Sequence, residues 1–116
     1  MTTEITFRPG AEGLMAALAV AEKLTSAAPV APTSLQITRN EFEYVPGTYN
    51  RPTGVEVYFH RAVDKVTAFA EAFDAVVTSR PSTGEYTLFT YADGVLDGVP
   101  FRAWTLTNEQ DTAVAA

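Results

Sequence analysis

Cysteine is absent from the 116-residue chain, which excludes disulfides, thiolate metal sites and a cysteine nucleophile. Histidine occurs once, at His60, which is too few for the usual transition-metal site. Basic residues are also scarce, because eight Lys and Arg stand against fourteen Asp and Glu, with no run of three. A nucleic acid is a polyanion that requires clustered basic side chains, so this distribution argues against nucleic-acid binding.

Long apolar runs are missing as well. No stretch approaches the roughly 18 residues of a membrane span, and the opening MTTEITFRPG has no basic or oily segment of a secretion signal. The chain also lacks a Gly-x-Ser-x-Gly elbow and a glycine-rich phosphate loop. We therefore expect no metal, no cofactor and no membrane partner, and a cytoplasmic location.

What is present is the composition of a globular protein, 47% hydrophobic and 19% charged, with a net charge of −6. A chain of this length can bury a core without disulfides or metals. We expect a single α+β domain over residues 1–108, followed by a flexible C-terminal tail over residues 109–116.

Two segments 52 positions apart share a pattern of a short alternating strand followed by an amphipathic helix. The first has a strand at Glu4–Phe7 and a helix over about residues 11–28. The second has a strand at Val55–His60 and a helix that stops at Arg80-Pro81. The apolar residues expected to face inward on the first helix are Leu14, Leu18, Ala21 and Leu24 or Thr25. Those on the second helix are Val66, Phe69, Ala70, Phe73, Val76 and Val77.

A strand is expected to return after each helix, within residues 34–45 and 85–95. Two such units predict a ferredoxin-like βαββαβ fold with an added C-terminal edge strand. The sheet is then antiparallel, with the order 5-4-1-3-2 and both helices on one face.

The segment YTLFTYADGVLDGVPFRAWTLT, residues 86–107, predicts a hairpin. Two Asp-Gly pairs suit a type I′ turn, and Asp97-Gly98 leaves longer arms than Asp93-Gly94. In the Asp97-Gly98 register Leu96 is opposite Val99 and Phe89 is opposite Leu106. Asp93 is then opposite Arg102 and Tyr91 is opposite Trp104, both favourable pairs. Gly94 becomes a bulge or a twist point, and Pro100 lies on an edge strand.

The two faces of this hairpin differ in character. One face carries Leu88, Thr90, Ala92, Leu96, Val99, Phe101 and Ala103, and we expect it to meet the helices. The other face carries Phe89, Tyr91, Asp93, Arg102, Trp104 and Leu106. Glu56, Tyr58 and His60 of the strand at residues 55–60 should join that second face, although a one-residue slip would exchange the two faces.

So many aromatic side chains on an uncovered face predict that something covers them. We expect a second copy of the chain or another protein, and the alternative is that the loop of residues 40–54 folds back over the face. The predicted function is a non-enzymatic protein-interaction or oligomerisation module. Its interface residues are Tyr58, Phe89, Tyr91, Arg102, Trp104 and Leu106.

The alternative function is a small-molecule site on the same face, which could be enzymatic. There His60 would be the general base and Glu56, on the same strand, its orienting carboxylate. The topology resembles ferredoxin-like proteins and dimeric α+β barrel proteins, and the second resemblance implies a cofactor-independent enzyme with its ligand on the open sheet face. The pattern G-x-x-D-G-V-P-x-R-x-W, from Gly94 to Trp104, resembles the C-terminal end of short uncharacterised proteins of high-GC Gram-positive bacteria and their phages.

Overall fold

Each helix is followed by a run of strands, α-β-β-α-β-β-β, in the computed structural model, which describes residues 4–39, 41–82 and 88–108. The helices are α1 (Gly10–Ala27) and α2 (Val63–Ala72). The strands are β1 (Ser34–Thr38), β2 (Gly54–Tyr58), β3 (Val76–Pro81), β4 (Leu88–Leu96) and β5 (Val99–Thr107). The tail predicted for residues 109–116 lies outside the described residues.

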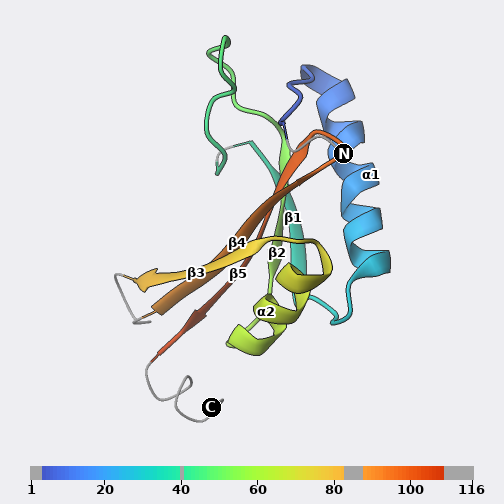
Figure 1. Ribbon diagram of the computed structural model, residues 1–116. Coiled ribbons are helices and arrows are strands. Elements are labelled where there is room, and N and C mark those ends of the chain that lie inside the picture. The colour runs from blue at the N-terminus through green and yellow to red at the C-terminus, as the bar shows by residue number, and fades with distance from the viewer. Residues whose placement is uncertain (1–3, 40, 83–87, 109–116) are drawn as a thin grey trace.

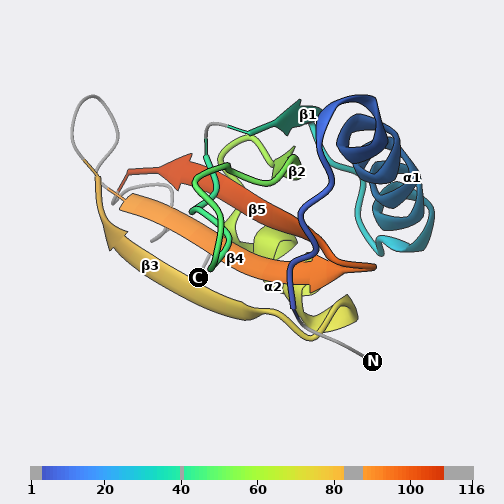
Figure 2. The ribbon, with the colours of Figure 1, turned by 90° about the horizontal axis from the view of Figure 1, so that it is seen from above.

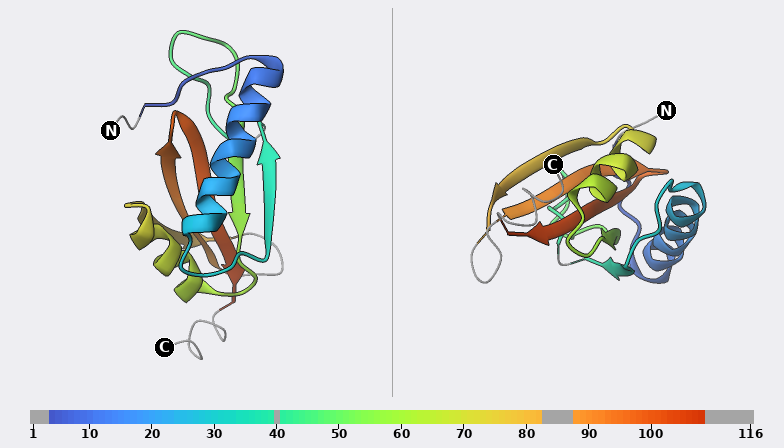
Figure 3. Two further views of the ribbon diagram at one scale, coloured as in Figure 1. Left: turned by 90° about the vertical axis from the view of Figure 1, so that its right-hand side faces the viewer. Right: turned by 90° about the horizontal axis from the view of Figure 1, so that it is seen from below.

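The strands form one twisted sheet in the order β1-β2-β5-β4-β3 (Figures 1 and 2). The β2–β5 pair is parallel and the other three pairs are antiparallel. Both helices pack on one face of the sheet, as Figure 3 (left) shows. The α+β class with two helices on one face is therefore confirmed. The sheet is mixed, however, and its order differs from the ferredoxin-like order expected.

The difference begins at the N-terminus, where Glu4–Phe7 is not a strand of the sheet. Its backbone contact is a bond of 2.8 Å from the Thr6 amide to the Gly98 carbonyl, in the turn of the β4–β5 hairpin. The central place expected for this segment is taken by β5, which pairs with both β2 and β4. A nine-residue strand offers more ladder bonds and more buried area than four residues followed by Arg8, Pro9 and Gly10.

The second helix ends earlier than predicted. α2 stops at Ala72, and the chain turns through Asp74, whose φ is 57°. Val76 and Val77 then begin β3, an edge strand, so their expected place on the helix is wrong. β-Branched residues favour strands over helices, and Pro81 is tolerated at a sheet edge.

The core lies between the two helices and the sheet. Val55, Val57 and Phe59 of the β2 segment are fully buried, as predicted for that strand. The inward residues of α1 are Gly13, Ala17, Val20, Ala21 and Leu24.

Leu14 and Leu18, which were expected inward, are 47% and 48% exposed. α1 contacts β1, β2 and β5, and β1 is the last strand of the sheet on that side. Because α1 lies over the end of the sheet, only part of its circumference packs against other elements. Leu14 and Leu18 lie outside that packed part. Neither helix of the described chain is long and apolar enough to cross a bilayer.

The hairpin register is confirmed, with Leu96 opposite Val99 and Tyr91 opposite Trp104. The turn residues Asp97 and Gly98 have φ of 52° and 80°, as a type I′ turn requires. Of the two roles predicted for Gly94, the bulge is wrong, because the ladder continues through the pair Gly94–Phe101. A Cβ at Gly94 would overlap the Phe101 ring, so the glycine makes room for that ring.

The predicted edge position of the last strand is also wrong, since β5 is central. Pro100 lies one residue before the parallel pairing with β2, which begins at Val55 opposite Phe101. A proline at this position therefore interrupts no bond of the described β2–β5 ladder.

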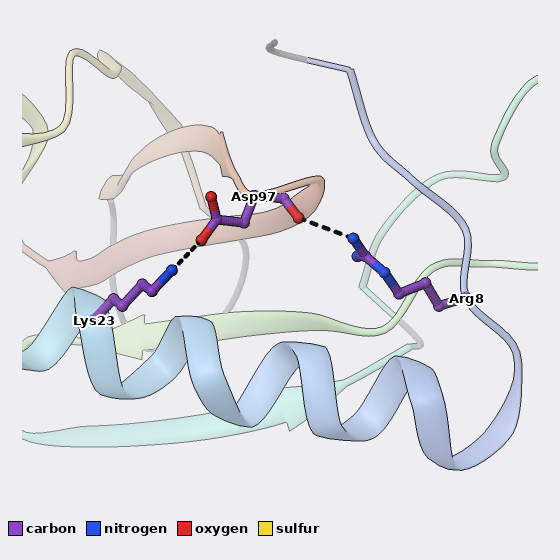
Figure 4. A network of polar contacts seen from close by, with 3 residues as sticks. All are labelled: Arg8, Lys23 and Asp97. Carbon is purple, nitrogen blue, oxygen red and sulfur yellow. Dashed lines mark hydrogen bonds and ion pairs between the residues drawn. The ribbon is translucent and has the colours of Figure 1, made fainter. Parts of the chain in front are cut away.

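The hairpin turn is held against α1 and the N-terminal segment (Figure 4). The Lys23 ammonium donates to the Asp97 carboxylate, and Arg8 Nη2 donates to the Asp97 backbone carbonyl at 3.4 Å. The Lys23 contact holds that side of α1 against the turn between β4 and β5.

Candidate functional site

The sheet face opposite the helices is organised in rows, because neighbouring strands are in register. Tyr58, Trp104 and Tyr91 lie side by side on β2, β5 and β4. Phe89 and Leu106 form the next pair along β4 and β5. We call these five side chains the aromatic face: Tyr58, Phe89, Tyr91, Trp104 and Leu106.

The rings of the aromatic face pack against one another. The ring centroids of Tyr58 and Trp104 are 4.6 Å apart, and those of Phe89 and Tyr91 are 4.9 Å apart and stacked. Phe89 also lies 6.1 Å from Trp104. Each ring is only partly buried. The expected inside and outside of the hairpin are therefore confirmed, since Ala92, Phe101 and Ala103 lie in the core.

Charged residues border the aromatic face on one side. Glu56, Arg102 and Asp93 form the row next to Tyr58, Trp104 and Tyr91. Arg102 Nε donates to Asp93 Oδ1 at 2.7 Å, and Nη2 donates to Oδ2 at 3.0 Å. This hydrogen bond raises the pKa of Arg102, so its cation persists beside the rings.

Two arginines stack over the rings. The Arg102 guanidinium carbon is 4.9 Å from the Tyr91 ring centroid. Arg80, from β3, lies 5.2 Å from the Phe89 centroid and 5.4 Å from that of Tyr91. Planar guanidinium groups bind aromatic faces well. The face is thus less exposed than its sequence suggests, because arginines from the same sheet cover Phe89 and Tyr91.

Arg80 is a site residue that the sequence interpretation missed, because residues 76–80 were assigned to a helix. The signal that could have found it is the run Val76-Val77-Thr78, which is rich in β-branched residues, followed by Arg80-Pro81.

Glu56 is a carboxylate of this surface whose pKa is shifted by its surroundings. Burial raises its pKa above the ordinary 4.5, the Glu41 carboxylate raises it further, and the Arg102 cation opposes both. Glu41 belongs to the loop between β1 and β2, so the loop and the sheet place two carboxylates near one another.

That loop covers only one end of the face. Phe42 is 7% exposed and packs on Gly54, and Arg51 Nη1 donates to the Phe42 carbonyl at 2.7 Å. Tyr44 and Tyr49 are 57% and 96% exposed. Figure 1 shows this segment rising past the upper end of the sheet. The loop of residues 40–54 therefore does not supply aromatic cover for Trp104 and its neighbours.

Two hollows lie at opposite ends of the face. One, of about 340 Å³, is lined by loop and hairpin residues that include Glu41, Phe42, Asp93 and Arg102. The other, of about 470 Å³, is a shallow groove lined by Arg80, Pro81, Ser82, Phe89, Trp104 and Leu106. Trp104 therefore has an open groove on the side away from the loop.

His60 lies at the turn beyond β2 and is exposed. The Tyr58 hydroxyl is 2.8 Å from His60 Nδ1, and the His60 amide donates to Thr33 Oγ1 at 2.9 Å. Glu56 is four residues earlier in the chain, which corresponds to about 13 Å along an extended strand. The structure thus pairs His60 with Tyr58 and does not bring Glu56 and His60 together.

No protein-family model matches the chain, and no curated protein has a detectably similar sequence. Within residues 4–39, 41–82 and 88–108, no three His, Asp or Glu side chains gather closely enough to hold a metal ion. The function must therefore be inferred from the geometry of the aromatic face.

Proposed function

We propose that the protein is a non-enzymatic oligomerisation module and that a second copy of the chain covers its aromatic face. The observation that carries this proposal is the row that Tyr58, Trp104 and Tyr91 form at paired positions of three neighbouring strands, on the face without helices. Tryptophan, tyrosine and arginine are the residues most enriched at the energetic centres of protein interfaces.

The side chains of this face are ordered before any partner binds. Stacking of Phe89 on Tyr91, and of Arg80 and Arg102 over them, restricts the rotamers of all four. Binding a rigid surface loses less conformational entropy than ordering a flexible one. A pre-ordered aromatic surface is therefore suited to a protein partner.

A second copy fits the charges of the face. The surface carries cations at Arg80 and Arg102 and carboxylates at Glu56 and Asp93, so both signs are available for self-complementary contacts. Two-fold contacts between identical surfaces are the commonest in soluble oligomers. The groove beside Trp104 and Leu106 gives room for a side chain of the second copy.

Light scattering on the variant Trp104→Ser tests the proposal. Loss of a central interface tryptophan should weaken dimerisation by at least about thirtyfold. Tyr49→Ser is the matched control, because it also removes an aromatic ring but from a side chain that is 96% exposed on the loop. Arg80→Glu is a second variant on the face that leaves the rings in place, and it should also weaken association.

A wild-type protein that stays monomeric at all concentrations would contradict the proposal. So would a dimer that both Trp104→Ser and Arg80→Glu leave intact, provided circular dichroism shows that the variants are folded.

A small-molecule site is the second candidate function, and the hollow beside Arg102 favours it. Its volume of about 340 Å³ lies within the usual range for ligand sites, about 300–1,000 Å³. The hollow is lined by the carboxylates of Glu41, Glu43 and Asp93, and its Arg102 cation is already paired with Asp93, so an amine-bearing ligand would suit it. Thermal-shift measurements with small amines, on wild type and on Glu41→Gln, would detect such binding. Equal shifts in both proteins would count against this site.

A further inference from the structure

A second surface of the molecule exposes apolar side chains where α1 lies beside β1. Four large hydrophobic residues there are exposed: Leu14 at 47%, Met15 at 64%, Leu18 at 48% and Leu35 at 39%. The flank of α1 that carries Lys23 is turned toward the hairpin by the contact with Asp97. Leu14 is on the opposite flank, where it lines a hollow with Ile37 and Thr38 of β1.

β1 is the terminal strand of the sheet in the described chain, and Figure 3 (left) shows it beside α1 with no strand on its outer side. An edge strand usually carries charges, a proline or a bulge, which prevent pairing with another chain. β3, the opposite edge, has Arg80 and Pro81. β1, with the sequence SLQIT, has none of these protections.

The segment around β1 is also free of charge. From Leu24 to Thr38 the sequence contains no Asp, Glu, Lys or Arg, in a chain whose net charge is −6. Two copies of an acidic protein repel one another, and the repulsion is weakest where they meet at a neutral surface.

The sequence of β1 is self-complementary about Gln36. If two β1 strands pair antiparallel with Gln36 opposite Gln36 of the second copy, Ser34 is opposite Thr38 of that copy. Leu35 is then opposite Ile37. Each pair joins like with like, hydroxyl with hydroxyl and apolar with apolar, and such pairs stabilise antiparallel ladders.

We propose that a second copy of this chain adds its β1 to the β1 edge, giving a continuous ten-stranded sheet. The two α1 helices then lie side by side on one face, with Leu14 and Leu18 of each copy in the contact. A specific interface needs roughly 1,000 Å² of buried area. Two five-residue strands alone would not supply it, so the exposed leucines of α1 are part of the interface.

This edge contact goes beyond the contact proposed for the aromatic face and does not depend on it. Its two-fold axis is perpendicular to the sheet, so both aromatic faces remain uncovered and point to the same side. One chain could use both contacts, and each can be tested with the other disabled.

The absence of cysteine allows a direct test by cross-linking. In the Trp104→Ser background, which disables the aromatic face, Gln36→Cys should form a disulfide-linked dimer under mild oxidation. Directly opposed residues of an antiparallel pair have Cα atoms about 4.5–5.5 Å apart, which suits a disulfide. Thr78→Cys is the matched control, since Thr78 is an exposed residue at the opposite edge, on β3. We expect at least about tenfold faster linkage for Gln36→Cys. Equal rates for the two variants would overturn the proposal.

Charge variants at the same position provide a second measurement. Gln36→Lys and Gln36→Glu, each alone, place like charges opposite one another and should abolish edge dimerisation. A mixture of the two should restore it as a heterodimer. Gln36 lies opposite Glu56 within the chain, so Gln36→Lys gains an opposite charge there and Gln36→Glu faces a like one. Circular dichroism on each variant alone, before mixing, establishes that both are folded. An edge dimer that persists in Gln36→Lys, or a mixture that stays monomeric, would overturn the proposal.

Discussion

Asp93 and Arg102 face one another across the β4–β5 ladder and form a two-point ion pair at 2.7 and 3.0 Å. The pair holds the guanidinium over Tyr91, with its carbon 4.9 Å from the ring centroid, so a single ionic contact positions the charge against an aromatic ring. The side chains are 23% exposed for Arg102 and 50% for Asp93, which places the pair at the rim of the aromatic face.

Asp93→Asn should destabilise the fold by about 0.5–1 kcal/mol, because a partly exposed ion pair is worth little more than that. The loss should shrink in high salt, which screens the wild-type attraction. Urea denaturation at low and high salt measures both effects. Glu71→Gln, on the exposed side of α2, is the control and should change the unfolding free energy by less.

Gly94→Ala should destabilise the protein by about 1–3 kcal/mol, the usual cost of overfilling a packed core. Its Cβ would overlap the ring of Phe101, which is 2% exposed and has little room to move. A double-mutant cycle with Phe101→Leu isolates this contact. The leucine substitution should cost less in the Gly94→Ala background than in wild type, and strict additivity would contradict this explanation.

Glu56→Gln should stabilise the protein at neutral pH. Burial and Glu41 raise the pKa of Glu56 in the folded chain above 4.5, so the folded state holds this proton to higher pH than the unfolded state. The stabilising contribution of Glu56 is complete below the unfolded pKa and is lost as the pH rises through the folded pKa. The gain from glutamine should therefore disappear on acidification to about pH 4. Thermal melts at both pH values measure it, with Glu43→Gln as the control.

The single tryptophan makes association at the aromatic face visible by fluorescence. Trp104 is the only indole in the chain, so quenching by acrylamide reports on that face alone. Quenching should decrease as the protein concentration rises from about 1 μM to about 100 μM, a range that covers moderate affinities. Unchanged quenching in a sample that light scattering shows to be dimeric would place the contact elsewhere, and the β1 edge would then be the surface to examine.

Local chemistry was sufficient to predict the hairpin and its faces. Asp97-Gly98 dictates the turn, and the pairs Asp93–Arg102 and Tyr91–Trp104 agree with the register it sets. These interactions join residues that are close in sequence, so the local sequence pattern is enough to predict the turn and the register. Most of the candidate site follows from that hairpin, together with Tyr58. The resemblance of the segment from Gly94 to Trp104 to short bacterial and phage proteins stays a prediction.

The centre of the sheet could not be predicted in this way. Parallel pairing of β2 with β5 joins distant parts of the chain, and no local feature distinguishes that partner from the alternating segment at Glu4–Phe7. Residues 76 and 77 fit the apolar periodicity of α2 and also begin a strand, so periodicity alone left the boundary ambiguous. Leu14 and Leu18 were misplaced because the phase of a helix depends on which part of the sheet it covers.

The central position of β5 has a consequence for how the chain folds. During synthesis α1, β1, β2 and α2 all emerge before the strand that joins the β1–β2 hairpin to the β3–β4 pair. Until β5 is available, the β1–β2 pair and the β3–β4 pair lack the strand that lies between them in the sheet. Closing such a long loop is slow compared with forming local turns. We expect the nascent polypeptide to remain open, and accessible to chaperones, until this last strand inserts between its two neighbours.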